Sequence, residues 1–303
     1  MKMLFCSDGS TQAENAVRFG ALIAAAYQAE TSILGITEKA NQMDALLQAL
    51  RRAQEILKEN HLNAELITKA GRPVREIVKR TQESKYDLIV IGATHKGMRG
   101  PWWMSARAYK IIESVEPPVL VVIGGRTALR RLLLCTGGGP QPNRMVEFGG
   151  DLARRMNAVV TLCHVLPEPP AMFADLIERE EDTERVLTSN SKLGRTLRLQ
   201  KELLEKLGVT CEIRLRHGLV VPELMRELQQ TEYDLVVTGS SPAQDRLRQY
   251  VMGDLTREIV NRAELPVLVL RTGPKQISHR LGDLVSHLFK HAPKTSEGES
   301  LIL

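Results

Sequence analysis

The chain has 303 residues, which is long for one hydrophobic core and sufficient for two. Its net charge of +5 is modest and its basic residues are spread along the chain, so no nucleic-acid partner is expected. No apolar run is long enough to span a bilayer, and the chain opens on a short strand-like run without the pattern of a signal peptide. These features exclude an integral membrane protein and predict a cytoplasmic one.

Four cysteines are present: Cys6, Cys135, Cys163 and Cys211. They form no CxxC pair, and each lies in an apolar, strand-like run. We therefore expect buried free thiols in a reducing compartment, without a metal or redox role.

In chain order, strand-like and helix-like patterns alternate from the first residues. The elements expected in the first part are strands at 2–7, 31–36, 64–68, 88–92 and 119–123, and helices at 12–28, 42–60, 74–82 and 106–115. Thr11 and Glu14 have the spacing of a capping box, which predicts the start of the first helix. Alternating strands and helices predict an α/β fold with a parallel sheet covered on both faces.

The second part of the chain repeats the first. Paired segments recur in the same order: LFCSDGS (4–10) and LLCTGGG (133–139), Gly71 with Glu76 and Gly218 with Glu223, KYDLIVIGA (85–93) and EYDLVVTGS (232–240), EPPVLVV (116–122) and ELPVLVL (264–270). A repeat this long indicates a duplicated domain rather than a solenoid. We predict domains at 1–123 and 130–271 and a tail at 273–303. Because both closing strands are apolar, we expect them to face each other and form an internal pseudo-dimer.

Two loops in each copy lie where a parallel sheet binds ligands, beyond the carboxyl ends of its strands. In copy one, the first loop contains Asp8 and the second runs over 92–105, with several glycines, several cations and the two tryptophans of the chain. A glycine loop that leads into a helix presents backbone N–H groups to phosphate. The alternatives are a tight turn with a helix cap at the first loop and a basic, interface-packing loop at the second.

Taken together, the DGS turn after the opening strand, the repeated glycine turns, the YDL strands, the long loop and the PVLV strands resemble a tandem universal stress protein. The resemblance covers both copies. It implies two doubly wound, parallel five-stranded sheets with strand order 3-2-1-4-5, paired through their last strands. In one branch of this family it also implies ATP, with Mg²⁺, bound at the two loops.

The ATP-binding pattern is then carried over residue by residue. In copy one, Asp8 is at the acidic position, and the other candidates are Gly9, Ser10, Gly92 and Ser105. His95 replaces the second glycine of the pattern. In copy two the candidates are Gly137, Gly239, Gly253 and Asp254. Asp254 stands where a hydroxyl is expected and is also a good helix cap.

No catalytic motif is found, so the resemblance predicts a stress-related regulatory or protective protein that binds adenine nucleotide, and not a dedicated enzyme. The alternatives are a nucleotide-free scaffold that binds a protein partner and an adenylyl-handling enzyme. In the tail, 276–291 has an amphipathic helical pattern that we expect to dock on this protein, on a second copy or on a partner, and the alternative is contact with a membrane surface. His287 and His291 have no third ligand nearby, and no metal is expected there.

Overall fold

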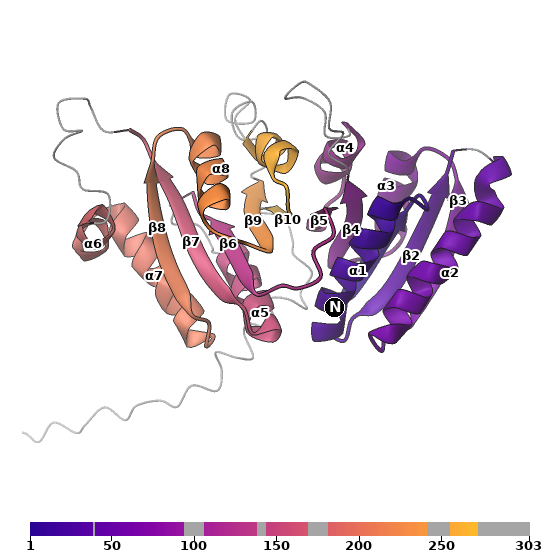
Figure 1. The fold of residues 1–303 in the computed structure, drawn as a ribbon, viewed down its shortest axis with the longest axis horizontal. Coiled ribbons are helices and arrows are strands. Elements are labelled where there is room, and N and C mark those ends of the chain that lie inside the picture. The colour runs from indigo at the N-terminus through magenta and orange to yellow at the C-terminus, as the bar shows by residue number, and fades with distance from the viewer. Residues whose placement is uncertain (39, 94–105, 138–143, 169–180, 241–254, 272–303) are drawn as a thin grey trace, which may run out of the picture. The chain divides into compact units, whose positions relative to one another are not determined.

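The computed structural model describes residues 1–38, 40–93, 106–137, 144–168, 181–240 and 255–271 (Figure 1). These residues belong to one compact unit, Met1–Gly273. The tail from Pro274 onward lies outside the described residues, so its helix and its docking stay predictions.

Copy one supplies the first half of the sheet. Its elements are β1 (Lys2–Ser7), α1 (Thr11–Ala26), β2 (Glu30–Thr37), a short 3-10 turn (Ala40–Gln42), α2 (Met43–Glu59), β3 (Ala64–Ala70), α3 (Pro73–Glu83), β4 (Leu88–Ala93), α4 (Ala106–Ser114) and β5 (Val119–Ile123). The predicted alternation of strands and helices is confirmed. The capping box is wrong by one residue, because Ser10 is the N-cap of α1 and its Oγ accepts the Ala13 N–H at 3.3 Å.

Copy two repeats the arrangement with two helices after its second strand. Its elements are β6 (Arg131–Cys135), α5 (Arg144–Met156), β7 (Val159–Leu166), α6 (Glu181–Thr188), α7 (Lys192–Lys206), β8 (Cys211–His217), α8 (Val220–Gln230), β9 (Leu235–Ser240), a helix over 255–262, and β10 (Val267–Arg271).

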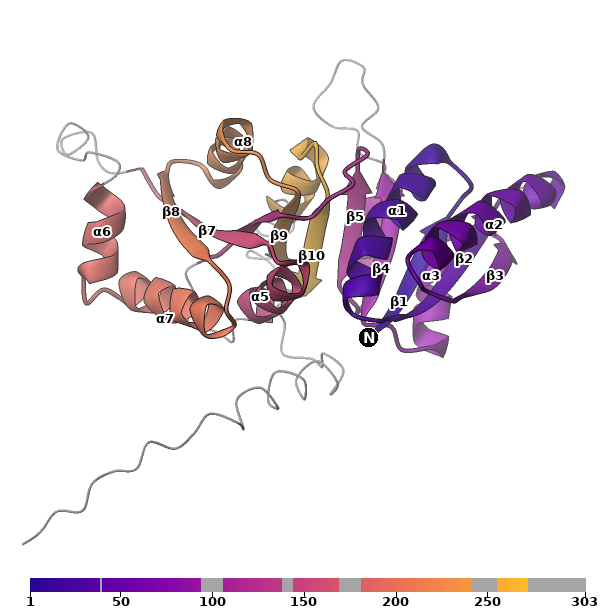
Figure 2. The same cartoon turned by 60° about the horizontal axis from the view of Figure 1, so that its bottom comes forward.

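The described strands form a single ten-stranded sheet in the order β3-β2-β1-β4-β5-β10-β9-β6-β7-β8. Each half keeps the predicted order 3-2-1-4-5, and the two five-stranded halves join through their last strands, as predicted. The closing strands β5 and β10 pair antiparallel, with Val121 opposite Val267 and Val119 opposite Val269 (Figures 1 and 2). This pairing satisfies the backbone groups that two apolar edge strands would otherwise expose.

Helices cover both faces of the sheet, as the continuous apolar strands require. On one face, α1 and α2 approach the strands closely. A Cβ at Gly20 would lie 2.6 Å from Phe5 Cε1, and one at Gly35 would lie 2.5 Å from Leu50 Cδ1. On the other face one apolar cluster continues from copy one into copy two, including Ile77, Ile111, Leu224 and Ile259.

Side chains as well as strands connect the two copies. The Arg155 guanidinium of α5 stacks over the Tyr27 ring at 4.4 Å from its centre, and its Nη1 donates to the Ala26 carbonyl at 3.3 Å. Arg271 of β10 donates to the Ile112 carbonyl of α4 at 3.2 Å. Cation–π contacts of this kind contribute about 0.5–2 kcal/mol each.

The repeated YDL motif has a structural explanation. The Asp87 carboxylate accepts the backbone N–H of Lys2 at 2.7 Å, and Asp234 accepts those of Arg130 and Arg131 at 2.7 and 3.0 Å. Each aspartate therefore holds the first residues of the neighbouring strand in place, β1 in copy one and β6 in copy two. The tyrosine before it is buried in both copies.

Beside each tyrosine lies a charged group, and its sign differs between the copies. In copy two, Glu227 is fully buried and accepts Tyr233 Oη–H at 2.7 Å and Arg216 Nε–H at 2.8 Å. Burial opposes ionisation of Glu227, but these hydrogen bonds outweigh it and hold the pKa of the carboxyl below its ordinary value. In copy one the equivalent residue is Arg80, whose Nε donates to Tyr86 Oη at 2.8 Å.

Candidate functional site

The turn between β1 and α1 presents Asp8 at the carboxyl edge of the sheet. Gly9 has φ +82°, a conformation that favours glycine, and its N–H donates to Ser7 Oγ at 3.1 Å. Asp8 Oδ1 accepts the Ser10 N–H at 3.0 Å. Asp8 is exposed, and its Oδ2 accepts no hydrogen bond from any residue that the structure describes. One carboxylate oxygen thus shapes the turn, and the other has no hydrogen-bond partner among the described residues.

This turn lies at a reversal in the strand order of copy one. β1 pairs with β2 on one side and with β4 on the other, all parallel, with Cys6 opposite Ile91. Asp8 and Gly92 therefore follow at the same edge. In open α/β sheets, ligands bind in the crevice outside the carboxyl ends of the strands at such a point.

Gly92 is required by close packing. A Cβ at this position would lie 2.3 Å from the Gln12 carbonyl oxygen and 2.8 Å from the Ala13 nitrogen, both in the first turn of α1. Only a residue without a side chain lets the end of β4 approach the helix this closely. The glycine of the ligand pattern consequently has a structural role that no ligand is needed to explain.

The equivalent edge of copy two has no acid where copy one has Asp8. Gly137 occupies that position, is exposed, and has no atom within 4 Å of an added Cβ. The preceding Thr136 is buried, and its carbonyl oxygen lies 2.7 Å from His164 Nδ1. Since a carbonyl only accepts, this nitrogen carries the proton, and this hydrogen bond gives His164 a structural role. Gly239 lies near the end of β9.

Three of the candidates, Ser105, Gly253 and Asp254, lie outside the described residues, as do His95, the two tryptophans and the rest of both long loops. The structure therefore brings Asp8, Gly9, Ser10 and Gly92 to one edge in copy one. In copy two it places Gly137 two residues beyond the end of β6 and Gly239 near the end of β9, and these two strands pair side by side.

The described residues offer neither a metal cluster nor a reactive thiol. No group of three His, Cys, Asp or Glu side chains comes together among them. Cys6, Cys135, Cys163 and Cys211 are free, and Cys135 and Cys211 are half-buried rather than buried. Burial raises the pKa of the Cys163 thiol to about 12 and that of Cys211 to about 11, so both stay protonated at neutral pH. No described helix is long and apolar enough to cross a membrane.

The family model of the universal stress proteins matches residues 1–122 and again 128–271. The chain belongs to the universal stress protein family. A universal stress protein of Synechocystis sp. is 21% identical over 310 residues, covering 89% of this chain and 99% of the relative. The tandem universal stress protein predicted from the repeats is thereby confirmed.

Solved structures share the fold of this universal stress protein. One from Archaeoglobus fulgidus, also a universal stress protein, superimposes with a TM-score of 0.68 at 16% identity, covering 90% of this chain and 98% of the other. A protein of unknown function from Pseudomonas aeruginosa gives 0.62 at 17% identity, covering 95% of each chain. At this level of identity the likeness concerns the arrangement of strands and helices.

Proposed function

We propose that this universal stress protein binds an adenine nucleotide, ATP with Mg²⁺, at the carboxyl edge of copy one. In this proposal it acts as a stress-related regulatory or protective protein and not as a dedicated enzyme. The observation that carries the proposal is Asp8, an exposed carboxylate whose Oδ2 has no hydrogen-bond partner among the described residues, presented by a glycine turn where the strand order reverses.

The chemistry of this edge suits the nucleoside end of the ligand. Asp8 Oδ2, which has no hydrogen-bond partner among the described residues, is an acceptor for ribose hydroxyl or base N–H groups. A charged acceptor makes stronger hydrogen bonds than a neutral one. Mg²⁺ in nucleotide sites is held largely by the phosphates and by water. The metal would therefore arrive with the nucleotide, at the phosphate end for which Ser105 is the predicted contact.

We expect the Asp8→Ala substitution to weaken ATP binding by about 1–3 kcal/mol, roughly 5- to 150-fold, the scale of a lost charge-assisted hydrogen bond. Isothermal titration calorimetry with MgATP measures it. Asp8→Asn retains the oxygen that accepts the Ser10 N–H but replaces the second acceptor oxygen by an NH2 donor, which separates loss of the ligand contact from loss of the turn.

Glu59→Ala is the matched control for this prediction, because Glu59 is an exposed acid at the far end of α2. Its affinity for MgATP should equal that of the wild type. Equal affinities for Asp8→Ala and the wild type would remove Asp8 from the site.

A nucleotide-free scaffold is the second candidate function. It is favoured by the turn and by Gly92, both of which local structure explains without a ligand. Freshly purified protein, denatured and analysed for released nucleotide, distinguishes the two. Adenine nucleotide in the supernatant supports the first function. Its absence, together with no binding of added MgATP, supports the scaffold.

The cytoplasmic location also stays a proposal, which rests on the four free cysteines.

A further inference from the structure

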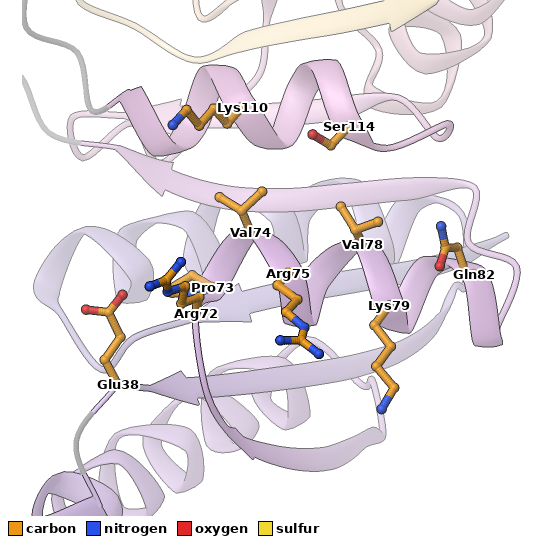
Figure 3. Close-up of a pocket in the computed structure, with 10 residues that line it drawn as sticks. All are labelled: Glu38, Arg72, Pro73, Val74, Arg75, Val78, Lys79, Gln82, Lys110 and Ser114. Atoms are coloured by element: carbon orange, nitrogen blue, oxygen red, sulfur yellow. The ribbon is translucent and has the colours of Figure 1, made fainter.

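A groove of about 710 Å³ lies between α3 and α4 of copy one (Figure 3). Val74 and Val78, one turn apart on α3, point from their helix toward α4, whose Lys110 and Ser114 line the opposite side. Both valines are half-buried. The groove thus has an aliphatic strip with polar walls and is separate from the Asp8 turn.

The walls are cationic. Arg72, Arg75, Lys79 and Lys110 line the groove, all four are exposed, and Glu38 is the one acid among the lining residues that the structure describes. Lys79 forms a long ion pair with Glu83 at 3.9 Å. Elsewhere in the described chain, no carboxylate forms a salt bridge with Arg72, Arg75 or Lys110. Like charges gathered without counter-ions favour an anionic ligand.

Copy two shows that the fold does not need these cations. Counted from the repeated glycine, Arg72 and Arg75 of copy one correspond to Leu219 and Pro222. Counted from the proline before the closing strand, Lys110 corresponds to Glu258.

The charges that copy two does carry in this region are neutralised. Lys79 corresponds to Arg226, which pairs with Glu223, and Glu258 pairs with Arg262 at 2.6 Å. At these corresponding positions, only copy one therefore has cations without a salt bridge to a described carboxylate: Arg72, Arg75 and Lys110. A feature that one copy has and the other lacks is not required for folding. The groove cations of copy one are therefore a candidate binding surface.

We propose that this groove binds an acidic, amphipathic segment of another protein. An α3 of 11 residues spans about 16 Å, which accommodates roughly three turns of a partner helix. Apolar side chains at i and i+4 of the segment would contact Val74 and Val78, and its acids would pair with the cations on both walls. Single-stranded nucleic acid fits less well, because none of the lining residues that the structure describes has an aromatic side chain on which bases stack.

The test uses the full chain and a fluorescein-labelled peptide of glutamate with leucines at i, i+4 and i+7, about three helical turns long. Fluorescence anisotropy should show saturable binding that weakens as salt is raised. The Arg75→Glu/Lys110→Glu double variant should weaken it at least about tenfold, because two attractions become repulsions. Arg51→Glu/Arg52→Glu makes the same change in net charge on the exposed surface of α2 and should leave binding within about twofold of the wild type.

Several results would overturn the proposal. They are no saturable binding of the acidic peptide, equal loss in both double variants, or equal affinity for a peptide with lysine in place of glutamate. Binding of phosphatidylglycerol vesicles that depends on Arg75 and Lys110, with none of the peptide, would replace the protein partner by a lipid surface. Melting temperatures are measured to check that both double variants fold. Asp8→Ala should leave peptide binding unchanged, so failure here and failure of the nucleotide proposal are distinguishable.

Discussion

Replacing Glu227 with glutamine is expected to lower the free energy of unfolding by about 3–5 kcal/mol, the cost of removing one partner of a buried ion pair. Glu227 is fully buried, whereas the Arg216 side chain is 18% exposed. Glutamine keeps an acceptor for Tyr233 but leaves the guanidinium without its counter-ion. Urea denaturation of the full chain measures the change.

The matched control lies in copy one. Arg80 pairs with Glu65 at 3.2 Å, and the Glu65 side chain is 60% exposed. Because exposed pairs contribute about 0–1 kcal/mol, Glu65→Gln should change the free energy of unfolding by no more than that. Equal effects of the two substitutions would contradict the assignment of Glu227 as a buried, stabilising charge.

The pH dependence of stability is a second test of the Glu227–Arg216 pair. The pKa of Glu227 is lowered from 4.5 in the folded protein, so its contribution is fully present above pH 4.5 and is lost as the pH falls through the lower, folded value. The stability difference between the wild type and Glu227→Gln should therefore be constant near neutral pH and shrink below pH 4.5.

The Gly92→Ala substitution is expected to destabilise the protein by about 1–3 kcal/mol, as overpacking does. The new Cβ would lie 2.3 Å from the Gln12 carbonyl oxygen, and backbone cannot move aside as a side-chain end does. The first turn of α1, which Ser10 caps, would have to shift, so MgATP binding at Asp8 should weaken as well. Chemical denaturation and calorimetry measure the two effects.

Gly137→Ala is the control for this prediction. It stands one residue beyond the buried Thr136, with no atom within 4 Å of the added Cβ, and should change stability by less than about 0.5 kcal/mol. A stable Gly92→Ala variant with wild-type ATP affinity would show that the strand and helix do not need this close approach.

The repeats and the apolar strands predicted most of the fold. The pairing of the two PVLV strands followed from the exposed edge that each would leave, and β5 and β10 do pair. That pairing joins the two five-stranded halves into one continuous sheet. The N-cap of α1 is Ser10 rather than the predicted Thr11. Adjacent hydroxyl residues offer the same capping chemistry, and only backbone geometry selects between them.

The sequence predicted the edge of the sheet at which the candidate site lies, but it did not predict the contacts within the site. Strand order placed Asp8 and Gly92 together, but the reason for Gly92 depends on its distance to Gln12, which the sequence does not contain. The exchange of Arg80 for Glu227 was missed for a similar reason. Each charge is matched by a residue on its own edge strand, Glu65 in β3 or Arg216 in β8, at positions that do not align in the repeat.

Equilibrium dialysis of the full chain against labelled ATP with Mg²⁺ tests the central claim most directly. Because copy one has the acid and the turn, and copy two has Gly137 in place of the acid, we predict one nucleotide per chain at saturation. Asp8→Ala should weaken this binding about 5- to 150-fold, and Glu59→Ala should leave it unchanged. No bound nucleotide, or one per chain with wild-type affinity in Asp8→Ala, would contradict a nucleotide site at the edge of copy one.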